Sequence, residues 1–155
     1  MRQFANPAGQ TGDAAQAYTR ALLAVLGERA PLDALAELPT WLEAHVATLD
    51  DDALRRPEAP GKWSVLQVTA HLLDAEIVHG HRTRRIAAEK DPVIEAYDQD
   101  AWVREFDHAN ADLGVTRHAL SALRTANLRH WSRLTPAQLE RAGTHRERGR
   151  ETAAH

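Results

Sequence analysis

The chain has 155 residues, and its 19 lysines and arginines against 22 aspartates and glutamates give a net charge of −3, which disfavours a nucleic-acid-binding surface. The absence of cysteine excludes disulfides and thiolate metal sites. No apolar run is long enough to cross a membrane, and the first residues resemble no signal peptide. Abundant alanine and leucine with few aromatic residues are typical of helices. We therefore expect a cytoplasmic, all-α protein that binds neither nucleic acid nor membranes.

The chain begins with a segment that we expect to be flexible, residues 1–13, which is rich in glycine, asparagine, glutamine and proline. One domain is expected over residues 14–155. Its first helix is predicted over about 14–26 and ends at Gly27, a favoured residue after a helix C-terminus.

A second helix is predicted over about 32–49. Pro39 lies inside it, where the proline ring would clash with the carbonyl of Leu35, so a kink or a restart is expected there. The apolar residues of this helix recur every three or four positions and form one face: Leu35, Leu38, Leu42, Val46 and Leu49.

The middle of the chain holds the clearest helix start. Asp50 begins an acidic run that could cap a short helical turn, and residues 56–61 form a loop. Ser64 and Gln67 have the spacing of a capping box, which predicts a helix from this point to about Glu89.

Beyond residue 92 a short helix is predicted over 98–106, a loop over 107–114 and a third long helix over 116–134. A second capping box at Thr135 and Gln138 predicts a short helix that ends near Arg141. No element is predicted for the charged tail. The apolar face of the third long helix consists of Leu120, Leu123, Trp131 and Leu134.

The nine histidines form no HExxH or HxxxH pair. His79 and His81 are two positions apart on a helix and point in different directions, so they cannot chelate one ion together. Five more are expected to be solvated or capping residues rather than ligands: His45, His108, His118, His145 and His155.

The helix that begins at Ser64 has an unusually polar face, on which Glu76 lies among apolar residues together with Thr69, His79 and Thr83. One interpretation is a half-exposed helix with these residues at its rim. The other is a polar cavity inside a helical bundle, where such sites are built. A purely structural helix would carry apolar residues at these positions, because burying an unpaired carboxylate is costly. His71 lies on the flank of this face with Asp74 one turn away.

Two further polar features have structural interpretations. Asn127 lies on the apolar face of the third long helix, and we expect it to be a hydrogen-bonding residue that fixes helix register. The basic residues from Arg82 to Arg85 are spread around their helix and are interpreted as a solvated surface.

Four segments in order resemble the DinB-like superfamily of bacterial four-helix bundles: PGKWSVLQVTAHLLDAE over 60–76, YDQDAW over 97–102, LRTANL over 123–128 and GTHRERG over 143–149. The resemblance covers about 18–155. It implies an up-down-down-up four-helix bundle, often a dimer, with a divalent metal bound by three histidines. His71 matches the ligand position in the HLxDAE segment.

The resemblance also implies a pair of histidine ligands on a last helix, and no residue here matches either position. On this resemblance, we expect the given sequence to lack most of that helix. Three explanations are open: the sequence is a piece of a longer protein, a partner supplies the missing helix, or the bundle is remodelled. We expect the first, because the apolar faces of the long helices require a fourth helix.

Three functions are considered. The first is a metal-dependent hydrolase or thiol S-transferase with nickel, zinc or iron as cofactor, His71 as ligand, Glu76 as base or orienting residue, a small-molecule substrate and a homodimeric state. The second is a non-catalytic, stress-associated binding or dimerisation module with a degenerate metal site. The third is a structural helical module in which Glu76 and His79 pair within a dimer interface.

Overall fold

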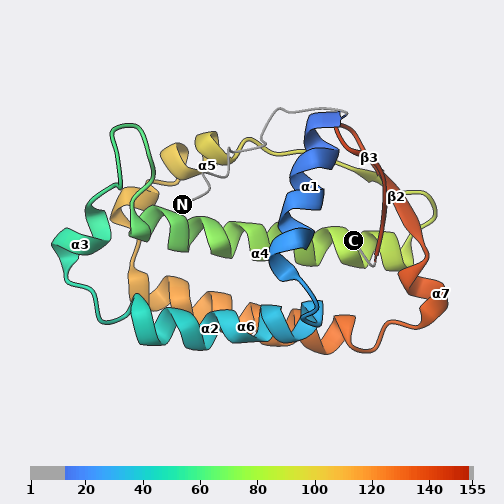
Figure 1. Ribbon diagram of the computed structural model, residues 1–155, viewed down its shortest axis with the longest axis horizontal. Coiled ribbons are helices and arrows are strands. Elements are labelled where there is room, and N and C mark those ends of the chain that lie inside the picture. Colours follow the sequence, from blue (N-terminus) through green and yellow to red (C-terminus); the bar gives the residue numbers. More distant parts are fainter. Residues whose placement is uncertain (1–12, 154–155) are drawn as a thin grey trace. The chain divides into compact units, whose positions relative to one another are not determined.

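The computed structural model describes residues 13–153, most of which are helical (Figure 1). The chain forms two compact units, which are described separately. The first comprises Ala30–His81 and Gln99–Arg133, and the second comprises the described residues 13–29, Arg82–Asp98 and residues 134–153. Residues 1–12 of the segment expected to be flexible lie outside the described part, and the single domain over 14–155 stays a prediction.

The regular elements of the first unit are helices, and an isolated antiparallel bridge joins Pro57 to Ser64 in the loop before α4. The core of this unit lies between α2, α3, α4 and α6 and consists of Leu42, Val46, Leu54, Leu66 and Leu120. α2 and α6 lie side by side (Figure 1). The elements are α2 (Pro31–His45), α3 (Asp51–Arg55), the first part of α4 (Val65–Ala88), α5 (Gln99–Glu105), a 3₁₀ turn (His108–Asn110) and α6 (Leu113–Trp131).

Local capping explains where these helices begin. The Ser64 backbone N–H donates to Gln67 Oε1 at 2.9 Å, and the Gln67 N–H donates to Ser64 Oγ at 3.3 Å, so the predicted capping box of α4 is confirmed. The Asp50 carboxylate accepts the Ala53 N–H at 2.8 Å and begins α3. α6 begins three residues earlier than predicted, because the Asp112 carboxylate accepts the Val115 N–H at 2.9 Å.

Of the two alternatives expected at Pro39, a kink or a restart, the restart does not occur, because α2 continues through this residue. Proline lacks the N–H that would bond the Leu35 carbonyl. That carbonyl instead accepts a hydrogen bond from Arg124 Nη1 on α6 at 2.8 Å. A side chain from a neighbouring helix thus replaces the missing backbone donor.

α2 ends at His45, four residues before the predicted end. The carbonyl of Leu42 accepts the N–H groups of both Val46, at 2.9 Å, and Ala47, at 3.0 Å. This shared acceptor ends the regular helical pattern before Leu49, which is exposed.

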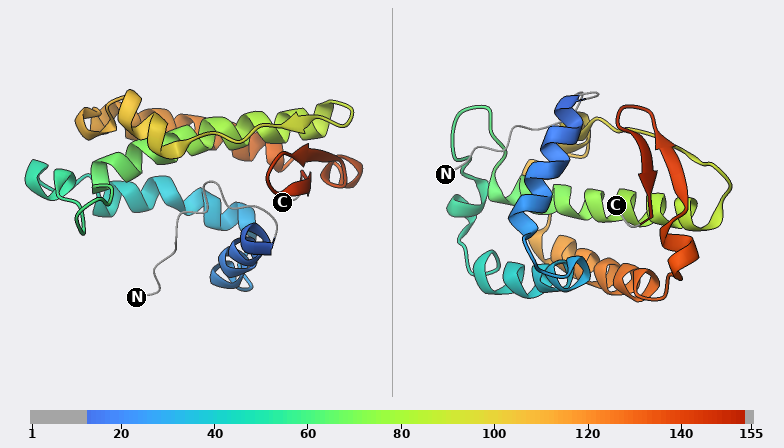
Figure 2. Two further views of the ribbon diagram at one scale, coloured as in Figure 1. Left: turned by 90° about the horizontal axis from the view of Figure 1, so that it is seen from above. Right: turned by 45° about the vertical axis from the view of Figure 1, so that its right-hand side comes forward.

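The second unit contains a small sheet that the sequence did not predict (Figure 2). β1 (Val93–Ile94) pairs in parallel with β2 (Ala142–His145), which pairs antiparallel with β3 (Gly149–Thr152). Arg141 Nη1 donates to the Ala87 carbonyl at 3.0 Å and ties the hairpin to the last turn of α4. The unit also contains α1 (Asp13–Leu26) and α7 (Pro136–Leu139), both close to their predicted positions.

Over residues 13–153, no helix combines the length and the apolar character needed to cross a membrane.

Candidate functional site

His71 lies on the second turn of α4, in the first unit. Its ring packs against Trp63 with centroids 4.9 Å apart, and its Nδ1 is buried without a hydrogen-bond partner. Desolvation by burial lowers the pKa of His71, an effect opposed by the nearby charge of Asp74. The neutral imidazole with an available nitrogen is the form that binds transition metals.

One turn further along α4, Asp74 pairs with a histidine from the 3₁₀ turn. His108 Nε2 lies 2.7 Å from Asp74 Oδ2, and the two side chains are 9% and 13% exposed. The expectation that His108 is a solvated residue was therefore wrong. Its partner Asp74 is 34 positions away in the chain, so the pair could not be predicted from the local sequence.

A divalent metal at His71 would need further ligands, since protein sites for such ions use three or four. Among the described residues, no three His, Cys, Asp or Glu side chains are grouped so that they could hold an ion. The unpartnered Nδ1 suits one ligand position, but the described residues do not complete a metal site.

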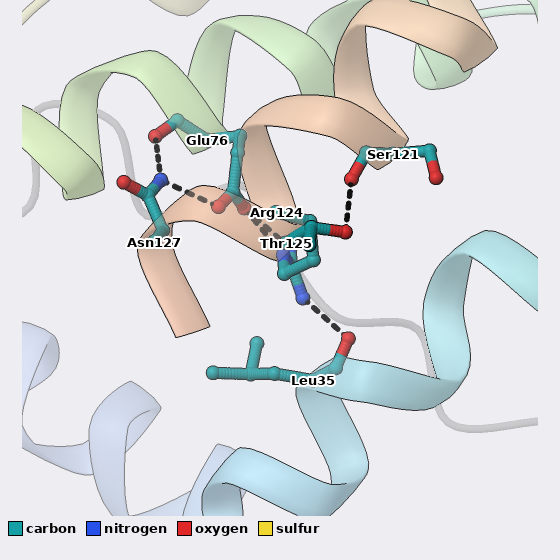
Figure 3. A network of polar contacts seen from close by, with 6 residues as sticks. All are labelled: Leu35, Glu76, Ser121, Arg124, Thr125 and Asn127. Atoms are coloured by element: carbon teal, nitrogen blue, oxygen red, sulfur yellow. Dashed lines mark hydrogen bonds and ion pairs between the residues drawn. The ribbon is translucent and has the colours of Figure 1, made fainter. Parts of the chain in front are cut away.

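Glu76 lies at the centre of a buried polar network between α4 and α6 (Figure 3). Its side chain is 2% exposed, and its Oε2 lies 2.6 Å from both Nε and Nη2 of Arg124, which is 8% exposed. Its Oε1 accepts a hydrogen bond from Asn127 Nδ2 at 2.7 Å. Both carboxylate oxygens are thus engaged, as a buried carboxylate requires.

Asn127 is fully buried, and its Nδ2 also donates to the Glu76 backbone carbonyl at 3.3 Å. This contact fixes α6 against α4, and the expectation that Asn127 is a structural hydrogen-bonding residue is confirmed. Arg124 was not predicted from the sequence to belong to this network. It follows Leu120 by four positions and precedes Asn127 by three, and this helical spacing could have placed it on the same face.

The polar face of α4 is divided in the structure. Thr69 is buried and donates its hydroxyl to the Val65 carbonyl at 2.8 Å, and Glu76 is buried in its network. His79 is exposed. Neither earlier interpretation holds for the whole face, because Arg124 and Asn127 fill the space around Glu76.

In the second unit, Arg82 was wrongly expected to be solvent-facing, whereas His145, expected to be solvated or capping, is a buried capping residue. Arg82 is 8% exposed, and its Nη2 donates to the Glu95 carbonyl at 2.6 Å while its guanidinium lies 5.8 Å from the Tyr97 ring centroid. His145 is 1% exposed. Its Nδ1 accepts the backbone N–H of Glu147 at 3.2 Å, so the capping part of the expectation was correct.

The remaining histidines of that group differ. His45 is exposed and stacks on Trp41, with centroids 4.7 Å apart, and His118 is exposed as expected. His155 lies outside the described residues.

A family model of the DinB superfamily matches residues 34–155. The chain belongs to the DinB superfamily. The structure resembles YfiT of Bacillus subtilis, described as "a probable metal-dependent hydrolase with an unusual four-helix bundle topology", with a TM-score of 0.74 and 28% identity over 79% of this chain and 70% of YfiT. This match supports the predicted all-α, four-helix-bundle fold class.

Relatives in this superfamily are named after a metal-dependent activity. A protein of Geobacillus thermodenitrificans, "Putative metal-dependent hydrolase", is 38% identical over 74 residues, which are 48% of this chain and 42% of the relative. The relative OB0782 of Oceanobacillus iheyensis bears the same description and is 28% identical over 118 residues, 76% of this chain and 68% of the relative. The chain thus spans less than two thirds of the first of these relatives.

Proposed function

We propose that this DinB-superfamily chain contributes His71 to a divalent-metal site, with nickel, zinc or iron as the metal, in a metal-dependent hydrolase or thiol S-transferase. The observation that carries the proposal is the buried Nδ1 of His71, which has no partner and belongs to an imidazole kept neutral by desolvation. The names of the relatives agree with a metal cofactor.

The proposal includes a homodimer and a small-molecule substrate. A second subunit, or residues outside the described part, would supply the further ligands. The described residues alone offer no group of three donors, so we assign them no metal-dependent chemical step.

The contacts of Glu76 fit a positioning role better than the role of a general base. A general base needs a free oxygen within reach of a proton, whereas both oxygens of Glu76 accept hydrogen bonds from α6. We propose that Glu76 holds α4, and therefore His71, in place.

Metal analysis of the protein purified without chelator or affinity metal tests the proposal. The wild type should contain a stoichiometric divalent metal, and His71→Ala should lose it while keeping its helical circular dichroism. His118→Ala is the matched control, because His118 is exposed and lies on another helix. Unchanged metal content in His71→Ala would contradict the assignment.

The absence of a three-donor group among the described residues favours a second candidate, a non-catalytic helical binding module. Binding of an ion to the folded state alone raises the melting temperature. A folded protein that contains no metal, and whose melting temperature does not respond to added zinc or nickel, would support this module and reject the metal site.

A further inference from the structure

His145, the last residue of β2, has a defined tautomer. Its Nδ1 accepts the backbone N–H groups of Glu147 at 3.2 Å and Arg148 at 3.4 Å. A nitrogen that accepts hydrogen bonds uses its lone pair and carries no proton, so in the neutral ring the proton is on Nε2. His145 therefore presents a donor, Nε2–H.

This donor is buried and has no hydrogen-bond partner. An unsatisfied buried donor is costly, because the group loses its hydrogen bonds to water and gains none in return, so the Nε2–H group requires an acceptor. A metal ion cannot fill the role. It would need the Nε2 lone pair, and the proton would then move to Nδ1, where two N–H groups already point.

A buried cation, Arg82, lies close enough to His145 for its charge to lower the pKa of the ring. Ile94 on β1 is the register partner of His145, and the next residue, Glu95, accepts a hydrogen bond from Arg82 through its backbone carbonyl at 2.6 Å. Arg82 is 8% exposed, and the described residues give it no ion-pair partner. A buried charge without a counter-ion is expensive.

Charges around the ring do not remove this imbalance. Arg148 is paired with Glu151 on β3, and the Glu95 carboxylate is paired with Arg146. Burial lowers the pKa of both Arg82 and His145, and the charge of Arg148 lowers both further, while the carboxylates of Glu151 and Glu147 act in the opposite direction. Among the described residues, however, no carboxylate forms an ion pair with Arg82. The cluster therefore combines a neutral donor without an acceptor and a buried cation without a directly bonded anion.

We propose that this end of the β2–β3 hairpin binds an oxyanion, the carboxylate or phosphate group of a small molecule, through His145 Nε2–H and the Arg82 guanidinium. A buried water would satisfy the imidazole but would leave the charge of Arg82 without a directly bonded counter-ion. An oxyanion satisfies both through charge-assisted hydrogen bonds. The inference does not depend on a metal at His71.

The full chain can be titrated with inorganic phosphate and, separately, with acetate at constant ionic strength, while the ring nitrogens are followed by long-range ¹H–¹⁵N NMR. The His145 Nε2 signal should shift saturably with one or both anions, and the anion that saturates at lower concentration identifies the class. No shift with either anion would overturn the proposal and leave a water as the occupant.

Two substitutions separate the two nitrogens of His145. In His145→Asn the amide oxygen can still accept the turn N–H groups, but the Nε2 donor is lost. His145→Gln places a donor near the Nε2 position. Affinity for the anion should fall by about tenfold or more in His145→Asn, the loss expected for a hydrogen bond to a charged group, and should fall less in His145→Gln.

Arg82→Met should reduce the affinity by at least as much. Arg146→Gln is the matched control, because Arg146 lies in the same turn but its side chain is 69% exposed and pairs with Glu95. Equal losses in Arg82→Met and Arg146→Gln would show nonspecific attraction to a basic surface and would overturn the site. Should His145→Asn fail to fold, the comparison of these two arginine variants decides the question.

Discussion

At the scale of single residues, some buried charges are met by side chains that offset them. Glu76 is the clearest case, since Arg124 and Asn127 together occupy both of its carboxylate oxygens. Removing one partner from such a buried pair leaves an uncompensated charge, which costs more than the pair itself contributes.

Glu76→Gln should accordingly lower the free energy of unfolding by about 3 kcal/mol, because Arg124 then stays buried without a counter-ion. Adding Arg124→Met should recover part of this loss, since no unpaired charge remains. Urea denaturation of the two single variants and the double variant gives the coupling energy. Additive losses would show that the two side chains do not interact as the structure places them.

At the scale of elements, local signals set most helix boundaries. Ser64→Ala removes the side chain that accepts the Gln67 N–H and should destabilise α4 by about 1 kcal/mol. Thr135→Ala removes the same kind of cap from the four-residue α7. It should cost less, since little packing depends on that helix. A larger loss at Thr135 than at Ser64, measured by urea denaturation, would contradict this ranking.

Gly143 is needed where β2 approaches β1. A Cβ at this position would lie 2.8 Å from the Pro92 carbonyl oxygen and 3.1 Å from Ile94 Cγ1, so Gly143→Ala should push the two strands apart. Hydrogen exchange of the Thr144 amide, which donates to the Pro92 carbonyl at 2.9 Å, should become faster. Exchange within α6 should be unchanged, and an unaltered Thr144 amide would show that the strand contact adapts.

These two cases show how far sequence alone could predict the molecule. Ser64 and Gln67 are three residues apart, so their capping box was readable, and so was the helical spacing that placed Asn127. The hairpin has no apolar alternation, and its strand β2 also pairs with β1 beside Pro92 and Ile94, which are distant in sequence. The buried states of His108, Arg82 and His145 likewise depend on partners brought near by folding.

At the scale of the whole molecule, one half-buried and one buried histidine link stability to pH. Desolvation lowers the pKa of both His71 and His145 below the ordinary value of 6.5. The unfolded chain therefore binds more protons than the folded chain as pH falls through this value. Their contribution to stability is complete above about pH 6.5 and is lost as pH falls below it.

The free energy of unfolding should thus be lower at pH 5.5 than at pH 7.5, and His145→Asn should reduce this difference. His118→Asn should not, because His118 is exposed. Urea denaturation at the two pH values measures both effects. The same pH difference in the wild type and in His145→Asn would show that His145 keeps an ordinary pKa in the folded protein.

The Leu35 carbonyl and Arg124, 89 positions apart, also constrain the order in which this sequence can change during evolution. While proline occupies position 39, loss of Arg124 removes the hydrogen-bond donor of both the Leu35 carbonyl and the Glu76 carboxylate. If position 39 first becomes alanine, the helix regains its own amide hydrogen, and a later loss of Arg124 leaves only Glu76 to be compensated. Substitutions along a lineage should therefore accumulate at position 39 before position 124, and a descendant that retains Pro39 should also retain the arginine.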